Sequence, residues 1–413
     1  MAEAPTRARH VVVAWTLAAG AIAYLDRICI STAAPAIRAE LDLSDGEMGL
    51  VFSAFTLAYA LFEIPSGWFA DRFGARLTLT RIVVWWSVLT AMTGLAWGLV
   101  SLLVLRFLFG IGEAGMFPAS ARAFGRWLPQ GERGRAFGLA LMTAALGGAL
   151  TQPLVVALLE RTSWRVAFAV FGSLGLVWAI GWWRWFRDEP GDHPAVNSAE
   201  LRLIVAGRGE ILHHESVPWG LVVRNPTLLA LCLMYGAAVY GWYFYVTWLP
   251  TYLLRARGFD LSQVGWLAAL PLLSIAGGVF LGGWASDRLA DWLGPRRGRR
   301  VTGLIGLPLA AAAVTAAVLT PSPPLSAWLF AAGAGLAALG IAPAWAVCVE
   351  IGGALSPLVI GFSLQRFGSW QAPLLSVAAL YVVAALLWLG IDPGKRITML
   401  EPEAEVPGAA TDR

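Results

Sequence analysis

The sequence predicts an all-α polytopic membrane protein built from two related halves. Hydrophobic residues make up 58% of its 413 residues and charged residues only 14%, against about 25% charged in a typical soluble domain. Many apolar runs have the length of about 20 residues that spans a bilayer. The segment GWFADRFGAR (Gly67–Arg76) also recurs in altered form as GWASDRLADWLGPRRGR (Gly283–Arg299), and such internal repeats are typical of duplicated membrane units.

The apolar runs predict about twelve membrane spans. A soluble fold would have to bury all of these runs in a single core, which their number and length exclude. The first run is not expected to be a signal peptide, because Asp26-Arg27 interrupts it and no small-residue cleavage site follows. In chain order the spans are expected near 11–37, 48–70, 82–99, 101–121, 137–159, 166–186, 226–254, 262–285, 302–320 and 325–347, with a final pair in 348–364 and 371–391.

Arginine and lysine residues gather in alternate loops, and this pattern predicts the orientation. The amino terminus, the turns after the second, fourth and eighth spans, the middle linker and Lys395-Arg396 are basic, whereas the loop 38–47 is mainly acidic. Short loops rich in Lys and Arg stay on the cytoplasmic side. We therefore expect a multi-pass protein of the cell (inner) membrane, surrounded by lipid, with both termini in the cytoplasm.

A single long polar stretch divides the chain between its sixth and seventh spans. The expected parts are an N-terminal six-helix bundle at 1–187, a cytoplasmic linker at 188–224, a C-terminal helix bundle at 225–396 and a disordered cytoplasmic tail at 397–413.

Several classes of function find no support in the sequence. No nucleotide loop, nucleophile triad or metal-spaced set of His and Cys occurs, so we expect no enzymatic activity, no cofactor and no metal site. The net charge of +4 follows from the loop bias and predicts no nucleic-acid partner. Cys29, Cys232 and Cys348 lie in apolar runs and are expected to pack there without forming disulfides.

The two halves differ in length at one place. GGALTQPLVVALLERTSW in the first half resembles GGALSPLVIGFSLQRFGSW in the second. Pro118 precedes the first Gly-Gly pair, at Gly147, by 29 residues, whereas Pro343 precedes the second, at Gly352, by 9. About 20 residues, close to one span, are missing from the second half. The sequence therefore predicts an eleventh helix shortened to Ile351–Leu364, and natural divergence with an early end to the tenth span is the alternative.

Asp26 and Arg27 form a charged pair in the middle of the first span. Ionisable side chains inside a membrane are costly, which makes them functional candidates. Neighbouring residues of a helix point about 100° apart, so the two side chains are poorly placed to face each other. We expect Arg27 to bind an anion in a central cavity and Asp26 to face a proton route, with a structural ion pair as the alternative.

Glu113 in the fourth span is the second intramembrane candidate. Arg106 precedes it by seven residues, or two helical turns, on the same helix face. A carboxylate near an arginine and a bound anion couples its protonation to the occupancy of the anion site, as proton symport requires. The alternative is a static Glu113–Arg106 pair that joins helices.

Aromatic side chains could line the same cavity. Tyr24 lies on the segment of Asp26 and could donate a hydrogen bond to a ligand. Tyr59 and Tyr240 are favoured as further ligands, ahead of the other lining candidates, which are Trp242, Tyr243 and Trp345.

At several motifs the chain resembles the major facilitator superfamily and, within it, the anion:cation symporter family of organic-anion carriers, which includes hexonate and hexuronate uptake systems. The motifs are YLDR (Tyr24–Arg27), GWFADRFGAR, RFLFGIGEAGMFPA (Arg106–Ala119), WLPQGERGRAFG and TWLPTYL (Thr247–Leu253). The resemblance covers nearly the whole chain. It implies the major facilitator fold, with two six-helix bundles, about twelve transmembrane helices and a monomeric state.

The resemblance also implies roles for single residues. Arg27 would bind the substrate carboxylate with Tyr24 and Tyr59 beside it, and Asp26 and Glu113 would be the proton-carrying carboxylates.

Gate residues are implied at the repeated loop. Asp71 would lie against the amino-terminal end of helix 11, where a carboxylate is favoured, and would close the inner gate with Arg72 and Arg76 in the outward-open state. Asp287 and Arg288 are the equivalent residues of the second copy.

The sequence as a whole favours a proton-coupled importer of a small organic carboxylate, such as a sugar acid, working by alternating access. The chain departs from the family where a polar, Asn-containing stretch usually precedes Gly352-Gly353. Unpaired substrate hydroxyls are costly, so either the substrate is less hydroxylated than a hexonate or the protein transports poorly. The alternatives are an exchanger of organic anions or phosphate, a receptor that does not transport, and a copy inactivated by the deletion.

Overall fold

A computed structural model describes residues 3–208, 225–341 and 351–391. Within these ranges all regular structure is helical, and nine continuous helical segments are long and apolar enough to cross a membrane. The expectation of an all-α polytopic membrane protein is therefore confirmed. Trp345 and the tail 397–413 lie outside the described residues, so the structure does not place them.

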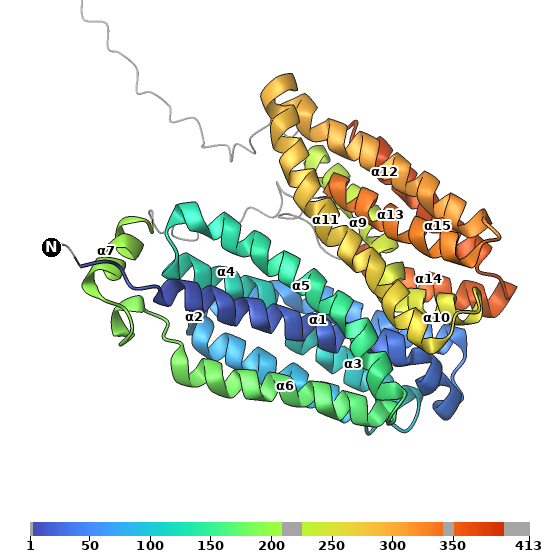
Figure 1. Cartoon of the computed structure of the whole chain (residues 1–413), viewed down its shortest axis with the longest axis horizontal. Coiled ribbons are helices and arrows are strands. Elements are labelled where there is room, and N and C mark those ends of the chain that lie inside the picture. Colours follow the sequence, from blue (N-terminus) through green and yellow to red (C-terminus); the bar gives the residue numbers. More distant parts are fainter. Residues whose placement is uncertain (1–2, 209–224, 342–350, 392–413) are drawn as a thin grey trace, which may run out of the picture.

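The first half forms one bundle (Figure 1). Gly74 has a φ of 82° and breaks the long helix α2 into two membrane spans, because glycine adopts this left-handed backbone region without the strain of a side chain. α3 and α4 together form one span over Leu99–Trp127. The helices are α1 (Ala8–Leu41), α2 (Asp45–Thr93), α3 (Leu99–Glu113), α4 (Met116–Trp127), α5 (Gln130–Leu159) and α6 (Trp164–Trp185).

The second half repeats this plan. A single π-helical turn, η2, interrupts its first span, which extends over Pro226–Arg255. The elements are α9 (Pro226–Tyr243), η2 (Phe244–Trp248), α10 (Leu249–Arg255), α11 (Leu261–Leu293), α12 (Pro295–Leu319), α13 (Pro323–Ile341), α14 (Ile351–Phe367) and α15 (Gln371–Leu387).

α14 is the helix that the sequence predicts to be shortened. It contains 17 residues and ends at Phe367, so its predicted end at Leu364 was three residues early. This helix starts where the described range 351–391 starts, and its described part is about 25 Å long, against a hydrocarbon core of about 30 Å. The following helix, α15, also has 17 residues, so shortness alone does not distinguish α14.

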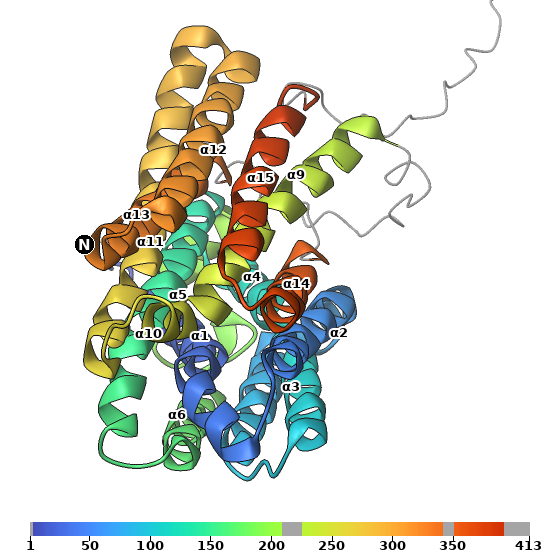
Figure 2. The same ribbon diagram turned by 90° about the vertical axis from the view of Figure 1, so that its right-hand side faces the viewer.

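The two bundles meet along two seams, α5 against α11 and α2 against α14. Glycine makes the second seam close, because a Cβ atom on Gly49 would lie 2.6 Å from the carbonyl oxygen of Pro357. Figure 2 views the end at which the bundles meet, with α14 against α2 and α10 near α1. Toward the other end, where α7 and the amino terminus lie, the ribbons of the two bundles diverge (Figure 1).

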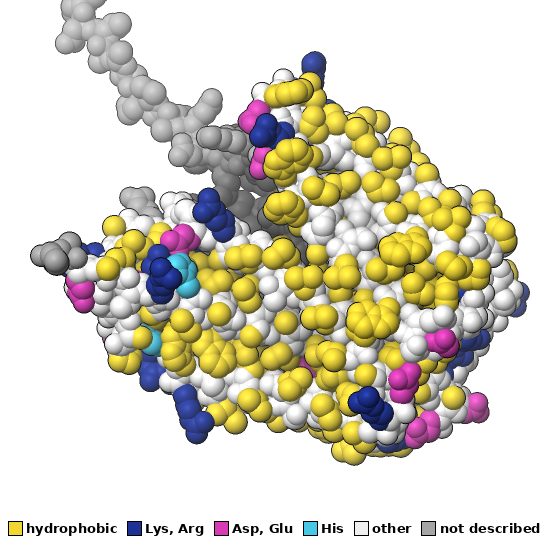
Figure 3. Space-filling model, viewed as in Figure 1, with side chains coloured by type: hydrophobic (Ala, Val, Ile, Leu, Met, Phe, Trp, Pro, Cys, Tyr) yellow, Lys and Arg dark blue, Asp and Glu magenta, His cyan; other side chains and the backbone are white. Residues whose placement is uncertain are grey.

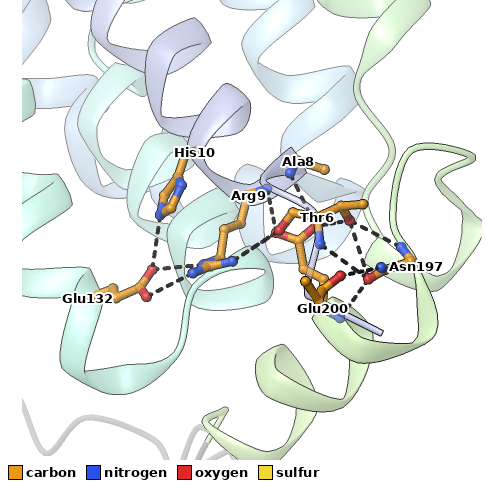
Figure 4. A network of polar contacts seen from close by, with 8 residues as sticks. Thr6, Ala8, Arg9, His10, Glu132, Asn197 and Glu200 are labelled. Carbon is orange, nitrogen blue, oxygen red and sulfur yellow. Dashed lines mark hydrogen bonds and ion pairs between the residues drawn. The ribbon is translucent and has the colours of Figure 1, made fainter. Parts of the chain in front are cut away.

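A short helix of the linker, α7 (Ser198–Ala206), docks on the first bundle at the diverging end (Figure 4). The buried carboxylate of Glu200 accepts hydrogen bonds from the Thr6 hydroxyl (2.5 Å) and from the backbone N–H groups of Ala8 (3.1 Å) and Arg9 (3.2 Å). Arg9 bonds Glu200 through Nη1 (3.0 Å) and Glu132 of α5 through Nε (3.1 Å). Glu200 thus supplies the acceptor that the first N–H groups of α1 need.

The sides of the molecule are apolar. Large hydrophobic side chains cover the face shown in Figure 3, and charged residues gather toward its two ends. Trp68, Trp97, Trp266 and Trp328 are among the exposed aromatic residues. A surface of this kind is stable only against lipid.

Candidate functional site

Arg27 and Glu113 form a buried ion pair between α1 and α3. Arg27 donates to one oxygen of Glu113, Oε1, from both Nε (2.9 Å) and Nη2 (2.7 Å). The exposed fractions of the two side chains are only 7% and 1%. Because the pair is dry, each charge depends strongly on the other. Glu113 thus occupies one of the donor edges, Nε and Nη2, at which a guanidinium can bind a carboxylate.

Aromatic rings surround the guanidinium of Arg27. Its Cζ atom lies 4.9 Å from the ring centre of Tyr24, 5.0 Å from that of Phe55 and 4.8 Å from that of Tyr59. Rings at this distance stabilise a cation through their negative faces. The structure thus brings Tyr24 and Tyr59 to Arg27, as the sequence predicts, and adds Phe55.

Another tyrosine reaches this site from the second half. Tyr243, the last residue of α9, directly precedes the η2 turn, and η2 packs against α1, the helix that carries Arg27. The Tyr243 side chain is among the electrostatic neighbours of Arg27. Tyr240, one of the two favoured aromatic candidates, instead shares a hydrogen bond with Ser376 of α15 at 3.2 Å. Its role as a ligand stays a prediction.

Asp26 lies in different surroundings from Arg27, although the two are adjacent in α1. Its carboxylate is fully buried, and the salt bridge of Arg27 goes to Glu113 and not to Asp26. The nearby charged side chains are Glu113 and Arg106, and the Trp86 indole is a further neighbour. Glu113 thus lies near both side chains, but only Arg27 pairs with it, and the two adjacent side chains point apart as helix geometry predicts.

Arg106 packs its guanidinium against aromatic rings, with Cζ 4.4 Å from the ring centre of Phe109 and 5.0 Å from that of Phe55. Phe55 thereby contacts both buried arginines, Arg106 and Arg27. Nε and Nη1 of Arg106 have no hydrogen-bond partner in the described structure. Arg27, and not Arg106, forms the salt bridge to Glu113 at 2.7 Å, which differs from the static Glu113–Arg106 pair considered above.

The predicted gate residues of the first half contact their own bundle. Asp71 pairs with Arg122 of α4 at 3.3 Å. Arg76 donates to the carbonyl oxygen of Trp183 from Nε (3.1 Å) and Nη2 (2.6 Å). Arg72 lies over the ring of Trp68 at 5.5 Å.

The gate residues of the second half show the same pattern. Arg288 lies over the ring of Trp284 at 5.7 Å, and Asp287 is exposed. The contact of Asp71 with helix 11 is predicted for the outward-open conformation, and it stays a prediction.

A charged contact that the sequence did not indicate joins the halves at the opposite end. Asp45, in the first turn of α2, pairs with Arg255 of α10 at 2.7 Å and also with Arg38 of α1. Ser44 and Glu47 form a capping box that fixes this end of α2. The acidic loop was evident in the sequence, but its pairing with Arg255, 210 residues away, could not be predicted without the fold.

No cluster of three or more His, Cys, Asp or Glu that could bind a metal ion occurs in the part of the chain that the structure describes.

Comparison with known proteins identifies the family. The family model described as Major Facilitator Superfamily matches residues 16–350. A protein described as a probable sulfoacetate transporter of Cupriavidus necator is 36% identical, with 94% of each chain covered. A D-galactonate transporter of Escherichia coli is 31% identical, with 94% of this chain and 96% of the relative covered.

Solved structures agree on the fold. A bacterial homologue of the human lysosomal transporter Spinster, in an inward-facing and unoccupied conformation, matches with a TM-score of 0.72 at 22% identity, covering 92% of this chain and 96% of that one.

The alignment with the sulfoacetate relative contains gaps in this chain. The alignment with the sulfoacetate relative extends over 420 positions, more than the 413 residues of this chain. At some positions the relative therefore has residues and this chain has none. Together with its helical bundles and its lipid-facing surface, these matches show that the chain is a multi-pass membrane transporter that belongs to the Major Facilitator Superfamily.

Proposed function

We propose that the protein imports a small organic anion together with protons, by alternating access between its two bundles. The observation that carries the proposal is the buried pair of Arg27 and Glu113, in which one carboxylate occupies two guanidinium donors. In this proposal a substrate carboxylate replaces Glu113 at these donors, which suit a carboxylate in geometry and charge.

Protonation of Glu113 would couple the binding of a proton to the binding of the substrate anion. A neutral Glu113 no longer neutralises Arg27, and an unpaired buried cation is costly. A substrate anion that binds Arg27 removes this cost. Release of the substrate and of the proton then restores the original pair. Anion binding and proton binding therefore favour each other.

Asp26 and Arg106 would form the second part of the coupling device. Asp26 is a buried carboxylate near Glu113 and Arg106, so its charge influences theirs across a dry interior. We assign to Asp26 the exchange of a proton and to Arg106 the electrostatic link between the two carboxylates.

The conformation supports an inward-facing state. The bundles diverge at the end that carries α7 and the basic turns (Figure 1), and basic loops lie in the cytoplasm. In the proposed cycle the Asp45–Arg255 contact would break on the outer side, and Asp71, Arg72, Arg76, Asp287 and Arg288 would close the inner side. The protein would act in the cell (inner) membrane with both termini in the cytoplasm.

The aromatic lining favours a compact, sparingly hydroxylated substrate. Arg27 is surrounded by the rings of Tyr24, Phe55 and Tyr59, and a polyhydroxylated acid would leave hydroxyls unpaired there. Of the named relatives, one is described as a probable sulfoacetate transporter and the other as a D-galactonate transporter. Short carboxylates and sulfonates such as sulfoacetate are the first candidates, and longer sugar acids come second.

The test is uptake into proteoliposomes under an acid-outside pH gradient, with labelled sulfoacetate and D-galactonate. We expect the wild type to accumulate substrate against its gradient. Arg27→Gln should weaken binding about 100-fold or more, and Arg27→Lys should recover little, since lysine lacks the two-donor fork. Glu113→Gln should bind substrate without driven accumulation. Robust pH-driven accumulation by Glu113→Gln would remove Glu113 from the coupling scheme.

Two alternatives have specific support. The second buried arginine, Arg106, favours an exchanger of anions, for which counterflow would proceed without any dependence on pH. The missing positions in the second half favour a copy that transports poorly. Insertion of about 20 residues before Gly352, close to one span, would then restore uptake, whereas equal uptake with and without the insert would reject this alternative.

A further inference from the structure

We propose that Tyr243 is a ligand of the anion bound to Arg27, contributed by the second bundle and positioned by Gly353. This inference rests on the proposed function and names a substrate contact within the same site.

The backbone around Tyr243 is irregular in a way that is common at functional sites. Tyr243 ends α9, and the next five residues, Phe244–Trp248, form the π-helical turn η2. The hydroxyl of Thr247 donates to the carbonyl oxygen of Tyr243. A π-turn inserts a residue into a helix and rotates the side chains around it, and such turns are frequent at ligand sites.

α14 fixes the ring of Tyr243 from the other side. A Cβ atom built on Gly353 would lie 2.2 Å from Cε2 and 2.6 Å from Cδ2 of this ring. No side chain fits at residue 353 unless the ring moves. The Tyr243 side chain is also buried, with an exposed fraction of 2%. The absence of a side chain at Gly353 thus allows the ring its present place, near Arg27.

A ligand shared by Arg27 and Tyr243 would connect the two bundles. Arg27 belongs to α1 of the first bundle, and Tyr243 to α9 of the second. A carboxylate or sulfonate has oxygens for both the guanidinium and the phenol, which can donate a hydrogen bond. A substrate shifts a conformational equilibrium only through contacts that differ between the two states. If one contact comes from each bundle, the two contacts form together only when the bundles are close. Such a substrate would therefore favour the state in which the bundles close around it.

The test measures affinity for sulfoacetate and D-galactonate by calorimetry on the purified full-length protein. Tyr243→Phe keeps the ring and removes the donor, and should weaken binding about tenfold, as expected for a hydrogen bond to a charged group. Gly353→Ala should weaken binding at least as much, because the ring must move. In a Tyr243→Ala background Gly353→Ala should add little, since the ring it displaces is gone.

Gly283→Ala is the matched control, because no heavy atom lies within 4 Å of a Cβ atom at that helical position. Size-exclusion profiles confirm that each variant is folded.

The outcomes separate this inference from the proposed function. If Arg27→Gln loses binding and Tyr243→Phe binds like the wild type, the inference fails and the proposed function stands. If Gly353→Ala costs as much in the Tyr243→Ala background as in the wild type, Gly353 does not act through the ring. If Arg27→Gln binds normally, or the wild type binds no probe, both proposals fail.

Discussion

Glu113 and Asp26 are two buried carboxylates with different relations to Arg27. Glu113 accepts hydrogen bonds from Nε and Nη2 of Arg27, whereas Asp26, adjacent to Arg27 in sequence, lies near Trp86 and Arg106. In the proposed mechanism Glu113 therefore competes directly with a bound anion for Arg27, and Asp26 does not. The two carboxylates should differ in how they change the pH dependence of binding.

We predict that wild-type affinity for sulfoacetate rises as the pH falls, by up to about tenfold per pH unit where one proton enters with each anion. Asp26→Asn should keep this dependence, because the Arg27–Glu113 pair is intact. Glu113→Gln should abolish it, because the competing carboxylate is gone. Calorimetric titrations with sulfoacetate between pH 5 and about 8 measure this pH dependence of the affinity. An affinity of Asp26→Asn that does not change with pH would contradict the assignment of the pH dependence to Glu113.

Much of this site was visible in the sequence, since charged residues stand out in apolar spans. Arg27, Glu113, Tyr24 and Tyr59 were all predicted, and the structure brings them together. Tyr243 was named only as one of several possible lining residues, behind Tyr59 and Tyr240, because α9 is apolar on every side and has no amphipathic stripe that would show which face meets the other bundle.

At the scale of elements, a helix break and a linker contact shape the first bundle. Gly74 divides α2 into two spans, which the sequence predicts from the polar loop. The docking of α7 was not predictable, because it depends on a carboxylate, Glu200, that contacts residues nearly two hundred positions away. This docking joins α1, α5 and α7 into one unit.

We predict that Glu200→Gln destabilises the contact among α1, α5 and α7 and lowers the free energy of unfolding. Burial alone would raise the pKa of Glu200, but hydrogen bonds from Thr6, Arg9 and Ala8 outweigh burial and leave the pKa below its ordinary value of 4.5. The carboxylate therefore stabilises the fold above that pH and ceases to do so as the pH falls through the folded-state pKa. At pH 7 the variant should lose about 1–3 kcal/mol.

Thermal unfolding across pH measures the effect, and the difference in Tm between the wild type and Glu200→Gln should narrow in acid. The control is Glu189→Gln, since Glu189 is half-exposed in its pairs with Arg126 and Arg208 and exposed pairs contribute little. If Glu200→Gln and Glu189→Gln lower the Tm equally at every pH, Glu200 has no special role.

At the scale of the whole molecule, the two bundles are connected at one end and diverge at the other. The Asp45–Arg255 pair crosses between them at the connected end. The sequence predicts two bundles from the repeat, but it does not indicate which conformation they adopt, because alternating states share one sequence and differ by small free energies.

We predict that Asp45→Asn shifts the population toward the outward-open state. Loss of a partly exposed ion pair changes the free energy by up to about 1 kcal/mol, or about fivefold in population. The variant can be tested with spin labels at residues 131 and 292, both of which are exposed. In Asp45→Asn a larger share of the distances between the two labels should be short, because the diverging ends approach each other in the outward-open state. Glu47→Gln, in the same helix turn but outside the contact, is the control, and identical distributions in wild type and Asp45→Asn would reject the role of the pair.

The most direct measurement of the central claim is proton uptake on substrate binding. Purified protein in a weakly buffered solution with a pH indicator receives sulfoacetate, and protons are counted against anions bound. Coupling through Arg27 and Glu113 predicts about one proton for each anion in the wild type and none in Glu113→Gln. Equal proton uptake by the wild type and Glu113→Gln would contradict the account.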